Sequence, residues 1–211
     1  MESNQTPYAV VFDLGGVLLN ISHTWQDAAQ TAGVTCRNLP AEPTPLATLK
    51  LLELYQTGQL PAEEYLPALA DFAGCDLEDA KDLHNGILVD EYPGALELVE
   101  ELQARGVQTG CLSNTSALHW ELLAGTGPYP GIQKLEWKMA SHLAGLHKPD
   151  PKIYELYCAT YDREPGSLIF FDDFPQNVDA ALACGWQAHW IDSSKDTSTQ
   201  LREHLGRLGV I

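Results

Sequence analysis

The feature that most constrains the fold is an alternation of short apolar runs with segments of helical periodicity. The first run, residues 8–14, is apolar apart from Asp13 and leads into Gly15 and Gly16. Three further runs follow later in the chain, at 107–112, 167–172 and 187–191. Strands without polar alternation are typical of a parallel sheet that is covered on both faces. The sequence therefore predicts an α/β fold, a Rossmann-like parallel sheet with helices on both faces.

Segments with helical spacing lie between and after these runs, and one part of the chain interrupts the alternation. Residues 20–90 contain several helical patterns in succession, at 22–32, 44–55, 61–73 and 76–87. We expect this block to form a helical cap, inserted after the first strand of a core made of residues 1–19 and 91–211. Pockets favour such junctions. The alternative is an elaborated crossover with no role at the site.

Composition excludes some classes of partner. The formal net charge of −17 argues against binding to nucleic acid or to an anionic membrane surface, since both need clustered Lys and Arg. No run is apolar and long enough to span a bilayer, and the polar start at residues 1–5 does not resemble a signal peptide. Five single cysteines without metal-ligand spacing indicate reduced thiols. We expect a cytoplasmic protein, and its oligomeric state cannot be read from the sequence.

Several polar residues follow the predicted strands directly. Asp13 ends the first strand, Ser113 follows the second, and the pair Asp172 and Asp173 ends a later one. Lys148 precedes a predicted helix at 151–161. In an open parallel sheet, ligands bind beyond the carboxyl ends of the strands. Each of these residues alone is also an ordinary turn or helix-cap residue, but their joint order is hard to explain by capping alone.

This set of residues suits chemistry on a phosphate ester. An ionised Asp13 is able to attack phosphorus and form an aspartyl phosphate. Asp13, Asp172 and Asp173 would repel one another without a hard cation among them, and Mg²⁺ prefers such oxygen ligands. Lys148 would add positive charge beside the phosphate. The Ser113 hydroxyl and the following backbone N–H groups would donate to its oxygens.

Four ordered segments resemble the motifs of the haloacid dehalogenase (HAD) superfamily of hydrolases. The segments are residues 12–18, 111–115, 147–154 and 170–177, and the resemblance covers nearly the whole chain. Residues 57–65 and 94–106 resemble the subgroup with an inserted helical cap. Within the superfamily, the sequence is most similar to bacterial sugar-phosphate phosphatases of the glucose-1-phosphatase type.

The resemblance implies a role for each of the polar residues above. Lys148 would neutralise both the nucleophile and the phosphate, and Ser113 and Asn114 would hold the phosphoryl group. The implied Mg²⁺ ligands are Asp13, which is also the nucleophile, the backbone carbonyl of Gly15, Asp173, and Asp172 directly or through water.

One position departs from the pattern of the family. Most of its phosphatases carry a second Asp two residues after the nucleophile, where this chain has Gly15. That Asp protonates the leaving oxygen and later activates water, and general acid–base catalysis is typically worth about 10²–10⁴-fold in rate. Water, the substrate or a cap residue such as His23 would have to replace it.

Three functions remain open at this point. The first is a Mg²⁺-dependent phosphomonoester hydrolase that acts on a small phosphorylated metabolite, with a sugar phosphate favoured, through an aspartyl phosphate on Asp13. The second is a metal-independent 2-haloacid dehalogenase, which the acidic pair Asp172 and Asp173 argues against. The third is a phosphate-ligand binding protein that lost turnover together with the acid at position 15.

Overall fold

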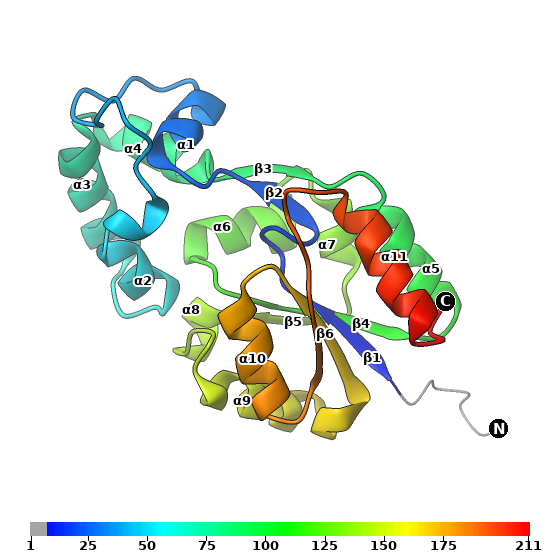
Figure 1. Cartoon of the computed structure of the whole chain (residues 1–211). Helices are drawn as coiled ribbons and strands as arrows, with labels where there is room; N and C mark the ends of the chain where they lie inside the picture. The colour runs from blue at the N-terminus through cyan, green and yellow to red at the C-terminus, as the bar shows by residue number, and fades with distance from the viewer. Residues whose placement is uncertain (1–7) are drawn as a thin grey trace.

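The protein contains a single parallel sheet of five strands, within the part of the chain that the structure describes (Figure 1). The structure is a computed structural model in which residues 8–211 are described, and the polar start lies outside these residues. The strand order is β5-β4-β1-β6-β7, and every pairing is parallel. This confirms the predicted α/β class. The strands are β1 (Ala9–Phe12), β4 (Gln108–Ser113), β5 (Trp137–Ala140), β6 (Leu168–Asp172) and β7 (Gln187–Trp190).

Strand register brings the ends of the three central strands level with one another. Phe12, the last residue of β1, pairs with Cys111 on one side and with Phe171 on the other. The residues that come next, Asp13 after β1 and Asp172 at the end of β6, therefore lie at the same sheet edge. The end of β4 at Ser113 reaches this edge as well.

Both faces of the sheet are buried, which explains the apolar run without alternation in β1. Val10 and Phe12 face one cluster, with α5 (Ala95–Ala104), α7 (Pro130–Lys134) and α11 (Thr197–Arg207). Ala9 and Val11 face the other, with α9 (Pro151–Tyr161) and α10 (Pro175–Ala183). All four residues are fully buried.

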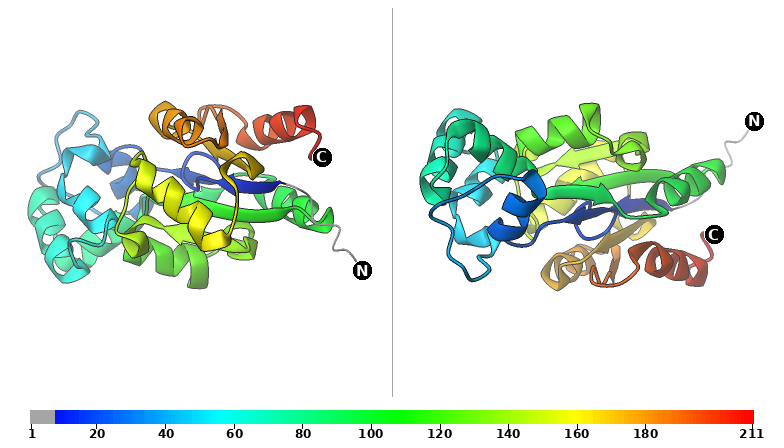
Figure 2. Two further views of the ribbon diagram at one scale, coloured as in Figure 1. Left: turned by 90° about the horizontal axis from the view of Figure 1, so that it is seen from below. Right: turned by 90° about the horizontal axis from the view of Figure 1, so that it is seen from above.

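A helical block with its own apolar core lies at one end of the molecule, opposite the C-terminus (Figure 2). An antiparallel ribbon, β2 (Leu19–Ile21) and β3 (Leu88–Glu91), connects the block to the sheet. The buried core of the block includes Trp25, Tyr65 and Leu83. Its helices are α1 (Trp25–Ala32), α2 (Leu51–Gln56), α3 (Ala62–Ala73) and α4 (Leu77–Asn85).

The predicted helix at 44–55 is wrong in extent. Residues Leu46–Thr48 form a short 3₁₀ turn, and α2 begins only at Leu51. Leu49 has an extended backbone (φ −84°, ψ 95°), which breaks the helix between the two segments. By contrast, the helix predicted at 151–161 has these bounds as α9.

Several short elements are not apparent from the sequence pattern, β5 and the ribbon strands among them. The others are the π-helical turn η2 (Leu122–Thr126), α8 (Ser141–Ala144) and the 3₁₀ turn η3 (Pro165–Ser167). The short helix α6 (Ala117–Glu121) follows β4, where helical spacing continues after residue 115. Within residues 8–211, every helix is too short or too polar to cross a bilayer. The five cysteines are all free thiols.

Candidate active site

The turn after β1 positions the Asp13 carboxylate, and its backbone lies close to the Asp173 carboxylate. The Asp13 backbone N–H donates to the Phe171 carbonyl at 2.8 Å, and its side-chain Oδ1 accepts the Leu14 N–H at 2.7 Å. Gly16 has a φ of 72°, and a Cβ atom there would overlap Asp173 Oδ2. Glycine is therefore required at position 16 both by the backbone conformation and by the close approach of the Asp173 carboxylate.

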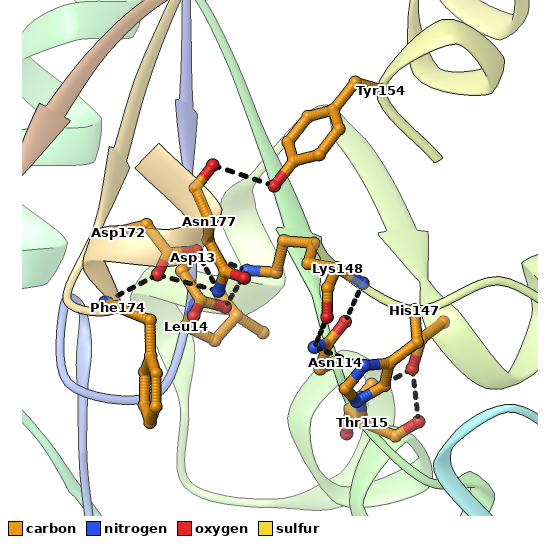
Figure 3. Close-up of polar contacts among 11 residues, drawn as sticks. Asp13, Leu14, Asn114, Thr115, His147, Lys148, Tyr154, Asp172, Phe174 and Asn177 are labelled. Carbon is orange, nitrogen blue, oxygen red and sulfur yellow. Dashed lines mark hydrogen bonds and ion pairs between the residues drawn. The ribbon is translucent and has the colours of Figure 1, made fainter. Parts of the chain in front are cut away.

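Lys148 joins two of the three carboxylates (Figure 3). Its Nζ lies 2.9 Å from Asp13 Oδ1 and 2.7 Å from Asp172 Oδ2, and its side chain is fully buried. The residue precedes α9 and reaches across the carboxyl edge of the sheet from outside it. One ammonium among three carboxylates leaves an excess of negative charge at this edge.

The three carboxylates fit a hard divalent cation. One oxygen atom from each of Asp13, Asp172 and Asp173 lies within 4.8 Å of the others. Burial raises the pKa of Asp13 to about 8, against the opposing effect of Lys148, and the two neighbouring carboxylates raise it further. Burial, followed by repulsion from Asp172, raises the pKa of Asp173 to about 6. A cation would restore the ionised form of both, and oxygen donors of this kind suit Mg²⁺.

Two residues of the segment 170–177 that carry no predicted role hold Asp172 in place. Asn177 Nδ2 lies 3.0 Å from both Asp172 oxygens, and the Phe174 N–H donates to Oδ1 at 2.8 Å. The Tyr154 hydroxyl in turn donates to the Asn177 carbonyl at 2.9 Å. With Lys148 also bound, protein donors take up both oxygens of Asp172. The available sequence signal was an amide in the first turn of the helix that follows the acidic pair.

Asn114 holds the backbone that carries the lysine. Its Nδ2 donates to the Lys148 carbonyl at 3.0 Å, and its Oδ1 accepts the Lys148 N–H at 2.9 Å. A direct contact between Asn114 and a phosphoryl group stays a prediction. Ser113 is buried at the end of β4, and within residues 8–211 its hydroxyl has no hydrogen-bond partner. Of the two side chains, Ser113 is the one left free to bind a ligand.

A buried imidazole cluster connects the helical block to the loop after Ser113. The rings of His84 and His119 stack with their centroids 3.9 Å apart. His84 Nε2 pairs with Ser116 Oγ at 2.9 Å, and His84 Nδ1 pairs with the Tyr65 hydroxyl at 3.1 Å. His84 comes from α4, whereas Ser116 caps α6. Burial lowers the pKa of His84 well below its usual value and that of His119 to about 4, so both rings are neutral at pH 7.

His23, the candidate acid from the cap, is exposed on the turn before α1. Its carbonyl accepts the Leu46 N–H at 3.4 Å, a contact inside the helical block. Within residues 8–211, no hydrogen bond or ion pair joins His23 to the three carboxylates or to Lys148.

Comparison with known proteins identifies the family. A family model described as haloacid dehalogenase-like hydrolase matches residues 8–185. The chain belongs to this family. Phosphatase MT3486 of Mycobacterium tuberculosis is 27% identical over 211 residues, covering 96% of this chain and 95% of that protein. The sesquiterpene phosphatase astK of Aspergillus oryzae is also 27% identical, over 218 residues, covering 94% of this chain and 96% of that protein.

Solved structures agree with the fold of this HAD-like hydrolase. An HAD family enzyme of Bacteroides thetaiotaomicron, in complex with magnesium and inorganic phosphate, superposes with a TM-score of 0.76 at 19% identity. The match covers 92% of this chain and 98% of that one. At this identity the similarity shows the fold alone. Membership of the family makes the chain a hydrolase.

Proposed function

We propose that the chain is a Mg²⁺-dependent phosphomonoester hydrolase that uses Asp13 as its nucleophile. The observation that carries the proposal is the buried Lys148 ammonium between Asp13 and Asp172, with a third carboxylate beside them. A lone ion pair would need only one acid. Three acids around one ammonium suit a centre that a cation and a phosphate ester complete.

The proposed reaction proceeds in two displacements at phosphorus. The Asp13 carboxylate attacks the phosphorus atom, and the bond to the leaving oxygen breaks, which gives an aspartyl phosphate. Water then attacks that phosphorus, releases inorganic phosphate and restores the carboxylate. The Leu14 N–H and Lys148 both bind Oδ1, so they fix the rotation of the attacking carboxylate.

Other residues would neutralise charge and hold the phosphoryl group. Bound Mg²⁺ would supply positive charge that offsets the repulsion between the carboxylate and the phosphate. Ser113 would donate its hydroxyl to a phosphoryl oxygen, and Asn114 would assist, mainly by holding Lys148. The proposed Mg²⁺ ligands are Asp13, the Gly15 carbonyl and Asp173, with Asp172 binding directly or through water.

We also propose that residues 20–90 act as a cap over a core of residues 1–19 and 91–211. The separate apolar core of the helical block supports this division. The substrate would be a small phosphorylated metabolite, with a sugar phosphate favoured on the resemblance to glucose-1-phosphatase-type enzymes, and the protein would act in the cytoplasm. The cap would then determine which metabolite enters.

The test is phosphate release from a panel of sugar phosphates, nucleotides and an aryl phosphate. We expect release with Mg²⁺, loss of release with EDTA, and loss in Asp13→Asn. If Asp13→Asn hydrolyses as fast as the parent, the nucleophile assignment is wrong. Halide release from 2-haloacids in the presence of chelator would favour a dehalogenase instead. Saturable binding in a tryptophan fluorescence titration, without turnover of any ester, would favour a binding protein.

A further inference from the structure

The space beside Gly15, where an acidic side chain would lie, is occupied by Ile21. A Cβ atom placed on Gly15 would lie 3.0 Å from Ile21 Cδ1, 3.5 Å from Cγ2 and 3.7 Å from Cγ1. Gly15 is not among the glycines with positive φ, unlike its neighbour Gly16. The backbone conformation at position 15 would therefore accept an ordinary side chain. The close approach of Ile21 is what crowds such a side chain.

Ile21 is held in this place from two sides. It pairs with Leu88 across the β2–β3 ribbon. It also packs against the apolar core of the sheet and against that of the helical block. Because both units contact it, a shift of Ile21 away from position 15 would disturb packing on both sides. The Ile21 side chain thus forms an apolar wall beside position 15, at the junction between the sheet and the helical block.

Three other proton-bearing groups near Asp13 are already engaged, and a fourth, the Ser113 hydroxyl, would donate to the phosphoryl group in the proposed reaction. Lys148 is paired with two carboxylates, and the Tyr154 hydroxyl donates to a backbone carbonyl. His147 lies on the far side of Asn114 from Asp13, and its Nδ1 contacts the Asn114 amide at 3.2 Å (Figure 3). None of these three groups is placed to do the work of the missing acid.

We propose that this apolar wall restricts the enzyme to phosphate groups carried on a weakly basic leaving oxygen, as in aryl, enol and acyl phosphates and phosphoanhydrides. Among sugar phosphates it would favour those with the phosphate on the anomeric oxygen, which is less basic as a leaving group than an ordinary alkoxide. The inference rests on the proposed phosphatase function. When Asp13 attacks, the phosphorus–oxygen bond breaks, and both electrons go to the leaving oxygen. Without an acid at position 15, that oxygen departs as an anion and takes a proton from water afterwards. An alkoxide is a poor leaving group when no acid protonates it as the bond breaks.

The test is a series of phenyl phosphates whose ring substituents change the acidity of the phenol but hardly its size. We expect kcat/KM with Mg²⁺ to fall steeply as the phenol becomes less acidic. We expect a simple alkyl phosphate to react more slowly than the best aryl phosphate by at least the factor of about 10²–10⁴ that a general acid is worth. Rates that do not depend on the leaving group would overturn the inference, while absence of release from every ester would overturn the proposed function as well.

A pair of double variants then tests the role of Ile21. Gly15→Asp with Ile21→Ala opens the space and supplies an acid, whereas Gly15→Asn with Ile21→Ala opens it and supplies an amide of the same shape. We expect the first to raise alkyl phosphate hydrolysis about tenfold or more over the second, with little difference on the most activated aryl phosphate. Equal rates for the two variants would count against the inference. If either fails to fold, as judged by thermal unfolding, the phenyl phosphate series on the parent decides.

Discussion

The active-site carboxylates and the imidazole cluster at the helical block are both buried and polar, yet they are built on opposite principles. The site gathers three acids around Lys148, and burial raises the pKa of Asp13 and Asp173 because charge remains uncompensated. The cluster keeps His84 and His119 neutral and gives each ring a hydrogen-bond partner. A buried charge without a full set of partners costs stability. This cost is present at the carboxylates, where a bound cation would supply the missing partner. It is absent at the imidazole cluster, where neutral rings only hold neighbouring segments in place.

Removing the proposed nucleophile should have the largest effect on hydrolysis and tests the contrast between the two regions most directly. Asp13→Asn keeps the shape of the side chain but cannot form the aspartyl phosphate, so we expect hydrolysis to fall by about 10³-fold or more. The measurement is phosphate release at saturating Mg²⁺. Asp71→Asn, on the exposed face of α3, is the matched control and should keep full activity.

Removing the buried ammonium of Lys148 should cost far more stability than removing an exposed one. Lys148→Met leaves Asp13 and Asp172 facing each other in a buried place, so we expect a loss of about 3–5 kcal/mol in the free energy of unfolding. Urea denaturation measures it. Lys134→Met breaks an exposed ion pair with Glu100 and should cost less than about 1 kcal/mol. Similar losses for the two variants would contradict the charged, buried character assigned to the site.

Opening the imidazole cluster should cost stability with less effect on chemistry. His84→Ala leaves Ser116 and the Tyr65 hydroxyl without their partner and creates a cavity, so we expect a loss of about 2–4 kcal/mol in the free energy of unfolding. Activity at a temperature where the variant is folded should fall far less than in Asp13→Asn. The control is the exposed His23→Ala, which should leave both stability and hydrolysis unchanged. A large drop in hydrolysis for His23→Ala would instead indicate that His23 replaces the acid missing at position 15.

The two regions should respond to pH with opposite sign in the metal-free protein. Lowered histidine pKa values contribute stability that is present above pH 6.5 and is lost as pH falls towards 4. The raised Asp13 pKa works the other way, because the folded state holds a proton that the unfolded state has released between pH 3.8 and about 8. Asp13 should therefore lower stability progressively from about pH 3.8 to about 8, and between pH 6.5 and 8 the histidines do not oppose this decline.

Chemical denaturation across this pH range, with and without Mg²⁺, checks both signs. Saturating Mg²⁺ or Asp13→Asn should flatten the decline above pH 6.5, whereas His84→Ala should flatten only the acid side. If Mg²⁺ altered the acid side and left the upper range unchanged, the ion would not be binding at the carboxylates.

Much of the fold follows from patterns that are local in the chain. The run that forms β1 has no polar alternation because both faces of the sheet are covered, and this is visible in the residues themselves. The helix at 151–161 begins with Pro151 after a capping Asp150, a local signal that marks its start correctly. The two short ribbon strands escape such reasoning because three or four residues carry too little pattern, and their pairing depends on residues some 70 positions apart.

The order of residues along the chain is enough to predict which chemical groups meet, since residues that end parallel strands share one edge of the sheet. For this reason the strand pattern alone groups Asp13, Asp172 and Asp173. Which of the polar groups are saturated, and which are open to a ligand, depends instead on three-dimensional packing. Asn177 holds Asp172, Asn114 holds the lysine loop, and Ile21 fills the space beside Gly15. Such contacts arise where distant segments pack side chain against side chain, and no periodicity along the chain records that.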